Sequence, residues 1–259
     1  MQTQETMINK NTTSGVWAMV LAAGRGTRLK QLTETQPKAL VKVNGKPLIE
    51  LVLNNLREHG FTHVVINLHH FGDQIIDFVS KNPMGLNIYF SDESKQLLDT
   101  GGALLKALPY FPSKKPVLVH NVDIISNLNL SELREKFIQS GTPAALVVQD
   151  RPSSRKLLFN DHQQLIGWKN EASSEFKWAN DPHQSYHSRA FSGIHFFYPE
   201  LFKPFTLESC SIIDIYLKLA RNHRIIALPA NNNLWFDLGK IEHLAEIESQ
   251  LKANTHVKN

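Results

Sequence analysis

Apolar residues in the first half of the chain recur in short runs of strand length. The first of these runs, 16–23, is unbroken, which is typical of a strand buried on both faces of a parallel sheet. Further runs lie at 63–68, 86–90 and 116–120. Between the runs, apolar residues at helical spacing predict helices at 46–60, 71–80 and 100–108. Strands that alternate with helices in this way predict βαβ units and a parallel sheet.

The second half of the chain has a different pattern. Short strands separated by polar turns predict an antiparallel extension at 144–150, 155–160 and 164–169. We expect a strand, a helix, a strand and a closing helix at 191–197, 212–220, 225–228 and 240–252. The segment 171–188 is polar, and we expect it to form a loop over the site or a disordered excursion. The predicted fold class is α/β, a Rossmann-like, mostly parallel sheet flanked by helices, with a smaller antiparallel extension.

No internal repeat and no linker divides the chain. We therefore expect one domain at 16–252 with two functional parts, 16–150 and 151–252. Residues 1–15 are polar and have no apolar core of signal-peptide length, so we expect a flexible leader there and a tail at 253–259. No run approaches the roughly 18 apolar residues that span a bilayer. These features predict a cytoplasmic protein with no membrane partner.

Composition adds little to this picture. The formal net charge is +4, but the basic residues are dispersed, which argues against nucleic acid as a partner. Cys210 is the single cysteine, so an internal disulfide is excluded and a reducing compartment is favoured. We interpret this cysteine as structural. The oligomeric state is expected to be a monomer or a small homo-oligomer.

The chain turns directly after the first apolar run, through Gly24, Arg25, Gly26, Thr27 and Arg28. Glycines in such a turn let backbone N–H groups approach an anion such as phosphate, and the arginines add positive charge. The alternative is that the two glycines only shape a strand-to-helix connection. The third glycine of the dinucleotide fingerprint is missing, because Leu29 stands at its position, and no Gly-Lys-Ser/Thr of a P-loop is present.

An ordered series of motifs begins at this turn. Its members are Leu21-Ala22-Ala23-Gly24-x-Gly26-Thr27-Arg28-Leu29, then Pro37-Lys38-Ala39-Leu40 and Gly45-Lys46-Pro47-Leu48-Ile49. The series resembles the sugar-phosphate nucleotidyltransferases, the nucleotide-sugar pyrophosphorylases, and the resemblance covers nearly all of 16–252. The most similar subgroup is short and includes N-acetylmuramic acid 1-phosphate uridylyltransferases and mannose 1-phosphate guanylyltransferases. The segments 71–76 and 244–249 resemble the uridylyltransferases in particular.

The resemblance implies that a sugar 1-phosphate oxygen attacks the α-phosphorus of a nucleoside triphosphate and that pyrophosphate leaves. This step needs cations around crowded phosphates and no protein nucleophile. The matching catalytic residues are Arg28, for the pyrophosphate, and Lys38, near the α-phosphate. The implied cofactor is Mg²⁺, held by Asp123 and by Asp237, which stands in a Trp-x-Asp-x-Gly motif. Val122 departs from the Gly-Asp that the family often has at the first aspartate.

The resemblance also assigns substrates to the two parts of the domain. The first part is expected to bind the nucleotide, through Leu21, Ala22, Ala23, Gly24, Arg25, Gly26, Thr27, Asn67, Asp99, Thr100, Gly101 and Gly102. The second part, with the antiparallel extension, is expected to bind the sugar. The residues implied for the sugar and its phosphate are Asn121, Lys169, Ser192, Gly193 and His195. An ordinary helix N-cap is the alternative role for Asp99 or Thr100.

We expect uridylyl transfer to a sugar 1-phosphate of the N-acetylmuramic acid type. Guanylyl transfer to mannose or heptose 1-phosphate is the alternative within the class. Two other classes stay open. A glycosyltransferase also binds a nucleotide sugar beyond a parallel sheet, but it has no use for the pyrophosphate apparatus at 24–38. A non-catalytic sensor of nucleotide sugars would not need to keep Arg28 or Lys38.

Overall fold

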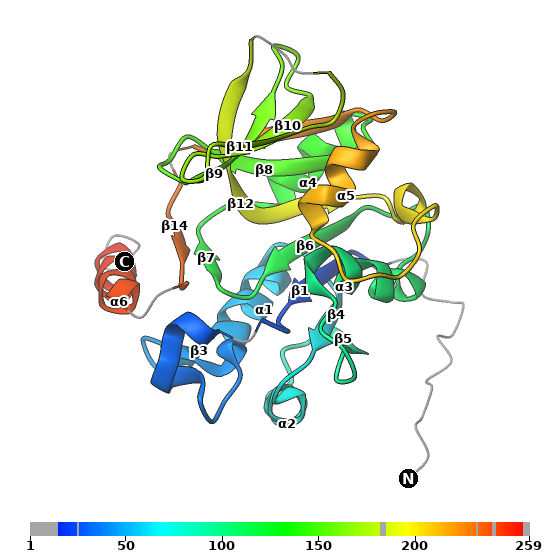
Figure 1. Cartoon of the computed structure of the whole chain (residues 1–259). Helices are drawn as coiled ribbons and strands as arrows, with labels where there is room; N and C mark the ends of the chain where they lie inside the picture. Colours follow the sequence, from blue (N-terminus) through cyan, green and yellow to red (C-terminus); the bar gives the residue numbers. More distant parts are fainter. Residues whose placement is uncertain (1–14, 25, 182–184, 232, 240–241, 256–259) are drawn as a thin grey trace.

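The computed structural model describes residues 15–24, 26–181, 185–231, 233–239 and 242–255 (Figure 1). Four parallel strands run through its centre in the order β6-β1-β4-β5. These strands are β1 (Trp17–Leu21), β4 (His63–Leu68), β5 (Asn87–Asp92) and β6 (Val117–Asn121). The helices of the parallel part are α1 (Leu48–Glu58), α2 (Gly72–Lys81) and α3 (Asp99–Ala107).

The long strand β12 (His187–Phe197) joins the parallel part of the sheet to an antiparallel part. It pairs antiparallel with β6 on one side and with β8 and β9 on the other. The remaining strands of the ten-stranded sheet are β8 (Ala144–Gln149), β9 (Arg155–Phe159), β10 (Leu165–Asn170), β11 (Glu175–Trp178) and β13 (Ile225–Pro229). The parallel pair β8 and β13 continues the sheet beside β12.

Shorter elements complete the described chain. Two small ribbons pair β2 (Lys42–Val43) with β3 (Lys46–Pro47) and β7 (Ile124–Ser126) with β14 (Trp235–Asp237). The other α-helices are α4 (Leu130–Gln139), α5 (Ile212–Leu219) and α6 (Glu242–Thr255). The 3-10 helices are η1 (Thr27–Thr33), η2 (Lys38–Leu40), η3 (Leu108–Tyr110) and η4 (Pro199–Phe202).

The sheet separates two hydrophobic clusters. Successive side chains of β1 point alternately into one cluster and the other. Ala18 and Val20 belong to the cluster that α1 and α2 cover, whereas Trp17 and Met19 belong to the cluster that α3 and α5 cover. All four side chains are at most 1% exposed. Helices therefore bury both faces of β1, as its unbroken apolar run predicts.

The predicted fold class is confirmed, and most of the predicted elements are present. The expectation for 171–188 is wrong in part, because β11 lies within it and pairs with β10; residues 182–184 lie outside the described chain. The predicted leader also lies outside it, except for Gly15. At the other end, α6 continues to Thr255, beyond the predicted end at 252. Among the described helices, none is long and apolar enough to cross a membrane.

Candidate active site

A cavity of about 470 Å³ opens where β1, β4 and β6 end. Leu21, Asn67 and Asn121 are in register across the last rung of these strands, so their side chains meet at one edge of the sheet. The sequence-predicted residues that line the cavity are Leu21, Ala23, Gly24, Gly26, Thr27, Arg28, Lys38, Asn67, Asp99, Thr100, Asn121 and Asp123. Residues that were not predicted also line it: Glu93, Leu97, Val122, Ser209 and Gly239.

The glycine turn forms one wall of this cavity. Gly26 has φ +62° and directly precedes η1. A Cβ on Gly26 would lie 2.9 Å from Thr33 Cγ2 and 3.1 Å from Lys38 Cβ, so a side chain there would push η2 away. At Gly24, by contrast, a Cβ would meet no heavy atom within 4 Å. Arg25 lies outside the described residues.

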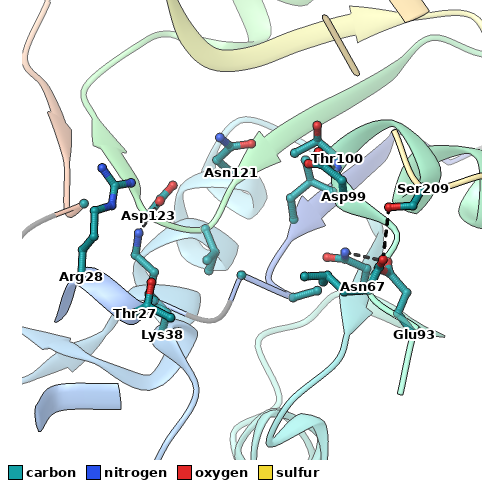
Figure 2. Close-up of a pocket in the computed structure, with 17 residues that line it drawn as sticks. Thr27, Arg28, Lys38, Asn67, Glu93, Asp99, Thr100, Asn121, Asp123 and Ser209 are labelled. Carbon is teal, nitrogen blue, oxygen red and sulfur yellow. Dashed lines mark hydrogen bonds and ion pairs between the residues drawn. The ribbon is translucent and has the colours of Figure 1, made fainter. Parts of the chain in front are cut away.

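Lys38 contributes a cation to the lining of the cavity. Its side chain is only 9% exposed and forms an ion pair with the carboxylate of Asp123, in the turn between β6 and β7. Figure 2 shows this pair with Arg28 on one side of the cavity, and Asn67 with Asp99 on the other. Arg28 is exposed and lines the same cavity. The cations expected for a polyphosphate therefore lie together.

The β7–β14 ribbon brings the two predicted metal ligands together. Asp237 pairs with Ile124, and Leu238 N–H donates to the backbone oxygen of Asp123 at 3.0 Å. Asp237 Oδ1 is buried and has no hydrogen-bond partner. Burial and the negative charge of Asp123 raise the pKa of Asp237, while Lys38 and the nearby arginines act in the opposite direction. Two carboxylates are thus held next to each other, one of them with an unpaired oxygen.

Asn67 and Glu93 link the ends of three strands to the α3 entrance. Asn67 Oδ1 accepts a hydrogen bond from the Ala22 N–H at 2.7 Å, and Asn67 Nδ2 donates to Glu93 Oε1 at 2.7 Å. Glu93 Oε2 accepts from the Leu98 N–H at 3.3 Å. Burial raises the pKa of Glu93. Sequence reasoning missed Glu93, although a carboxyl directly after β5, at the edge shared by the strand ends, was a usable signal.

The α3 entrance faces the cavity through Asp99 and Thr100. Asp99 has φ +58°, an unusual backbone conformation for a residue other than glycine. The two glycines that follow pack against the loop before α5. Gly101 N–H donates to Cys210 O at 2.8 Å, and a Cβ on Gly102 would lie 2.2 Å from Glu208 O. Close packing against the backbone of this loop therefore explains why glycine stands at both positions. The same packing brings Ser209 of the loop to the cavity.

Asn121 is the expected sugar residue that lines the cavity directly. Gly193, with φ +77°, lies beside it: a Cβ there would be 2.9 Å from Asn121 Nδ2. Ser192 is fully buried, and its backbone oxygen accepts a hydrogen bond from Trp235 Nε1 at 2.9 Å. Neither Gly193 nor Ser192 is among the described residues that line the cavity.

Lys169 and His195 are not among the described residues that line this cavity. Lys169 Nζ is 2.9 Å from Glu171, which Lys156 also approaches, at 3.3 Å. His195 is 1% exposed, and its Nδ1 is 2.7 Å from the hydroxyl of Tyr216 on α5. Burial lowers the pKa of His195 to about 3, so its imidazole is neutral at physiological pH.

A family model described as a MobA-like NTP transferase domain matches residues 18–191, which include the glycine turn, Lys38 and Asp123. The chain belongs to this family. It is therefore a nucleotidyltransferase, and the resemblance to the sugar-phosphate nucleotidyltransferases is confirmed.

Relatives of this NTP transferase cover most of its length. The N-acetylmuramate alpha-1-phosphate uridylyltransferase of Neisseria meningitidis serogroup B is 29% identical over 90% of this chain and 96% of its own. A mannose-1-phosphate guanyltransferase of Candida glabrata is 26% identical over 86% of this chain and 61% of its own. The structure of HddC from Yersinia pseudotuberculosis superposes with a TM-score of 0.73 at 22% identity, covering 91% of this chain and 99% of that one. This last similarity concerns the fold.

Proposed function

We propose that the protein transfers a uridylyl group from UTP to a sugar 1-phosphate of the N-acetylmuramic acid type, giving a nucleotide sugar and pyrophosphate. The observation that carries the proposal is the partly buried Lys38–Asp123 pair in a cavity bordered by Gly24, Gly26 and Arg28. A polyphosphate is bound well where glycines let its oxygens approach backbone N–H groups and where cations are held in place beside it. The N-acetylmuramate relative, matched over 96% of its length, supports the choice of acceptor and of base.

In this proposal the cations do most of the catalytic work. Lys38 is held in place by Asp123 and by the short η2 helix, so its charge is positioned near the α-phosphate before the substrate arrives. Arg28 is exposed at the other wall, where its guanidinium contacts the leaving pyrophosphate. Preorganised cations stabilise the charge that develops on the phosphates during in-line displacement.

The residues present fit a magnesium ion. Asp123 and Asp237 adjoin, and Asp237 has an unpaired buried oxygen that a cation would satisfy. No three His, Cys, Asp or Glu side chains of the described chain form a metal-binding group. A site with two carboxylates suits magnesium, which takes its remaining ligands from phosphate and water. When bound, magnesium would neutralise phosphate charge at this position.

The two functional parts divide the substrates between them. The 16–150 part binds the nucleotide, with the base and ribose beside Asp99 and Thr100, which line the cavity opposite Lys38. The 151–252 part binds the sugar from the side of Ser192 and Gly193. Lys169 is the proposed contact for the sugar phosphate, which would compete with Glu171 for its ammonium group. His195 supports the sugar site from within the core, through the strand it shares with Gly193.

Guanylyl transfer to mannose 1-phosphate is the alternative, and the Candida glabrata relative supports it. The test is a matrix of UTP, GTP, CTP, ATP and dTTP against N-acetylmuramic acid, mannose and glucose 1-phosphates, with pyrophosphate release as the readout. We expect the highest kcat/KM for UTP with N-acetylmuramic acid 1-phosphate, and loss of activity when EDTA is added. A GTP–mannose optimum would favour the alternative. Consumption of a UDP-sugar without pyrophosphate chemistry would favour a glycosyltransferase.

A further inference from the structure

Arg151, which follows β8, is a cation that forms no ion pair with the carboxylates of the described chain. Its guanidinium lies 3.7 Å from the ring centroid of Trp235, and Nη2 donates to the backbone oxygen of Phe191 at 2.8 Å. The Nε atom is buried and has no hydrogen-bond partner. No Asp or Glu in the described chain forms an ion pair with it, and the adjacent Asp150 pairs with Arg189 at 2.9 Å.

The guanidinium lies against the indole of Trp235. This indole is itself fixed, because its Nε1 donates to Ser192 O at 2.9 Å and the ring packs against the hydrophobic core. Burial lowers the pKa of Arg151 and the charge of Asp237 acts in the opposite direction, but a guanidinium stays protonated in proteins. A half-buried charge in a fixed orientation, with N–H donors to spare, is arranged to receive an anion.

Two cavities meet at Arg151 and Trp235. One, of about 450 Å³, is otherwise lined by amides and one carboxylate, those of Gln149, Asp150, Asn231 and Asn233. The other, of about 250 Å³, extends between β14 and α6 and includes Asp237. Neither cavity shares a described lining residue with the nucleotide cavity, although Asp237 and Gly239 place them close to it.

We propose that Arg151, supported by Trp235, binds a carboxylate carried by the acceptor sugar, so that the preferred acceptors are acidic sugar 1-phosphates. The inference rests on the proposed function. The triphosphate belongs with Lys38 and Arg28 in the nucleotide cavity, and the sugar 1-phosphate is assigned to Lys169. Arg151 lines other cavities, which Lys169 does not line, and this leaves it for a different oxyanion of the acceptor. A planar guanidinium fork suits a carboxylate, and the amides beside it suit sugar hydroxyls.

Two acceptors that differ only in a carboxylate-bearing lactyl ether test this assignment: N-acetylmuramic acid 1-phosphate and N-acetylglucosamine 1-phosphate. We expect the unaltered enzyme to prefer the acidic acceptor in kcat/KM. The Arg151→Gln variant should raise KM for the acidic acceptor about tenfold or more, the usual effect of losing a hydrogen bond between charged groups. The KM for the neutral acceptor should stay within about twofold. Arg155→Gln, at an exposed arginine that begins β9, is the matched control and should change neither value.

Several outcomes would overturn the assignment. Equal kcat/KM for both acceptors in the unaltered enzyme would overturn the assignment. This measurement needs no variant, so the proposal stays testable even if Arg151→Gln does not fold. Equal loss of affinity for both acceptors in the variant would show that Arg151 serves the 1-phosphate or the fold instead. No change in the variant would exclude contact with the acceptor. Failure of the proposed function is distinguishable, because then no pyrophosphate forms with either acceptor.

Discussion

Three charged side chains meet beyond the ends of β6 and β14. Lys38 and Asp123 are paired, but Asp237 is held beside Asp123 without a hydrogen bond to its Oδ1 atom. Water would solvate such groups better than this environment does, so the arrangement lowers the stability of the empty protein. Polyphosphate and a divalent cation are the ligands that would compensate for this.

Loss of either cation should reduce turnover strongly. We predict that Lys38→Ala and Arg28→Ala each lower kcat by about 10² or more, because a preorganised electrostatic donor is typically worth that much. Steady-state pyrophosphate release measures the effect. Lys42→Ala is the control, since Lys42 is exposed on β2 and does not line the cavity. Losses below about threefold in both variants would contradict the assigned roles.

Removal of the Asp237 charge should stabilise the empty protein and inactivate it. Its pKa is raised in the folded state, so the ionised form is disfavoured by folding. We predict that Asp237→Asn has a higher melting temperature than the parent at pH 7. The difference should vanish below the ordinary aspartate pKa of 3.8 and grow as pH rises through the raised pKa. Thermal melts from pH 3 to 8 in EDTA measure this. A lower melting temperature at pH 7 would contradict it.

Sequence motifs identified Lys38 and Asp123 individually, but they could not show that the two side chains pair. The residues are 85 positions apart, and their contact depends on how the fold places η2 near the turn that follows β6. Arg151 carried no motif at all. Its role depends on Trp235, which only the folded chain brings to it. Contacts between residues so far apart in the sequence cannot be predicted from local sequence patterns.

Among the elements, the α3 entrance and the loop before α5 fit together most tightly. Both glycines of α3 face the backbone of 208–210, and the Thr100 hydroxyl accepts a hydrogen bond from the Ile212 N–H at 3.0 Å. The loop comes from the part of the chain proposed to bind the sugar, yet it places Ser209 in the cavity proposed to bind the nucleotide. The two parts are therefore joined at the expected base pocket.

Two glycine-to-alanine substitutions should distinguish a glycine needed for packing from a glycine needed for nucleotide binding. In Gly102→Ala the new Cβ would be 2.2 Å from Glu208 O, so the loop must move, and we predict a loss of about 1–3 kcal/mol of stability. In Gly24→Ala the Cβ meets nothing within 4 Å, so stability should hold while UTP binding weakens at the cavity wall. Urea unfolding and calorimetric titration with UTP measure the two effects. Identical behaviour of the two variants would refute the distinction.

Helix and strand patterns predicted most elements, and the omissions have physical reasons. The three-residue strands β7 and β14 are too short to show a period, and their partners are distant in sequence. α4 was predictable but was not predicted: the Asn129 side chain accepts from the Glu132 N–H at 3.1 Å as an N-cap, and Leu130, Leu133 and Phe137 are buried. In the predicted loop, β11 alternates charged and aromatic residues over only four positions, which is too short to stand out from a polar segment, and it is largely exposed.

At the scale of the whole molecule, β12 joins the two proposed functional parts in one sheet. It is eleven residues long and pairs with β6 of the parallel part as well as with β8 and β9. Pairing with three strands was not visible in the sequence, where only 191–197 stood out as apolar. The proposed functional division at residue 150 therefore falls within a continuous sheet.

A continuous sheet predicts cooperative unfolding. We expect a single calorimetric transition, with equal calorimetric and van't Hoff enthalpies. UTP at about 100 times its Kd should raise the transition by about 5–10 °C, since such binding adds about 2.7 kcal/mol. Differential scanning calorimetry with and without UTP measures both. Two separate transitions, only one of which responds to UTP, would show that the parts unfold independently.

The most direct measurement is ³¹P NMR of a reaction containing the protein, Mg²⁺, UTP and N-acetylmuramic acid 1-phosphate. Attack at the α-phosphorus predicts equal amounts of pyrophosphate and of a uridine diphosphate sugar, with the UTP and sugar phosphate signals decreasing together. The Lys38→Ala variant should give the same products at a greatly reduced rate. Formation of UDP with a doubly phosphorylated sugar would place the attack at the γ-phosphorus. That result, or no reaction with any base and sugar 1-phosphate, would contradict nucleotidyl transfer at this cavity.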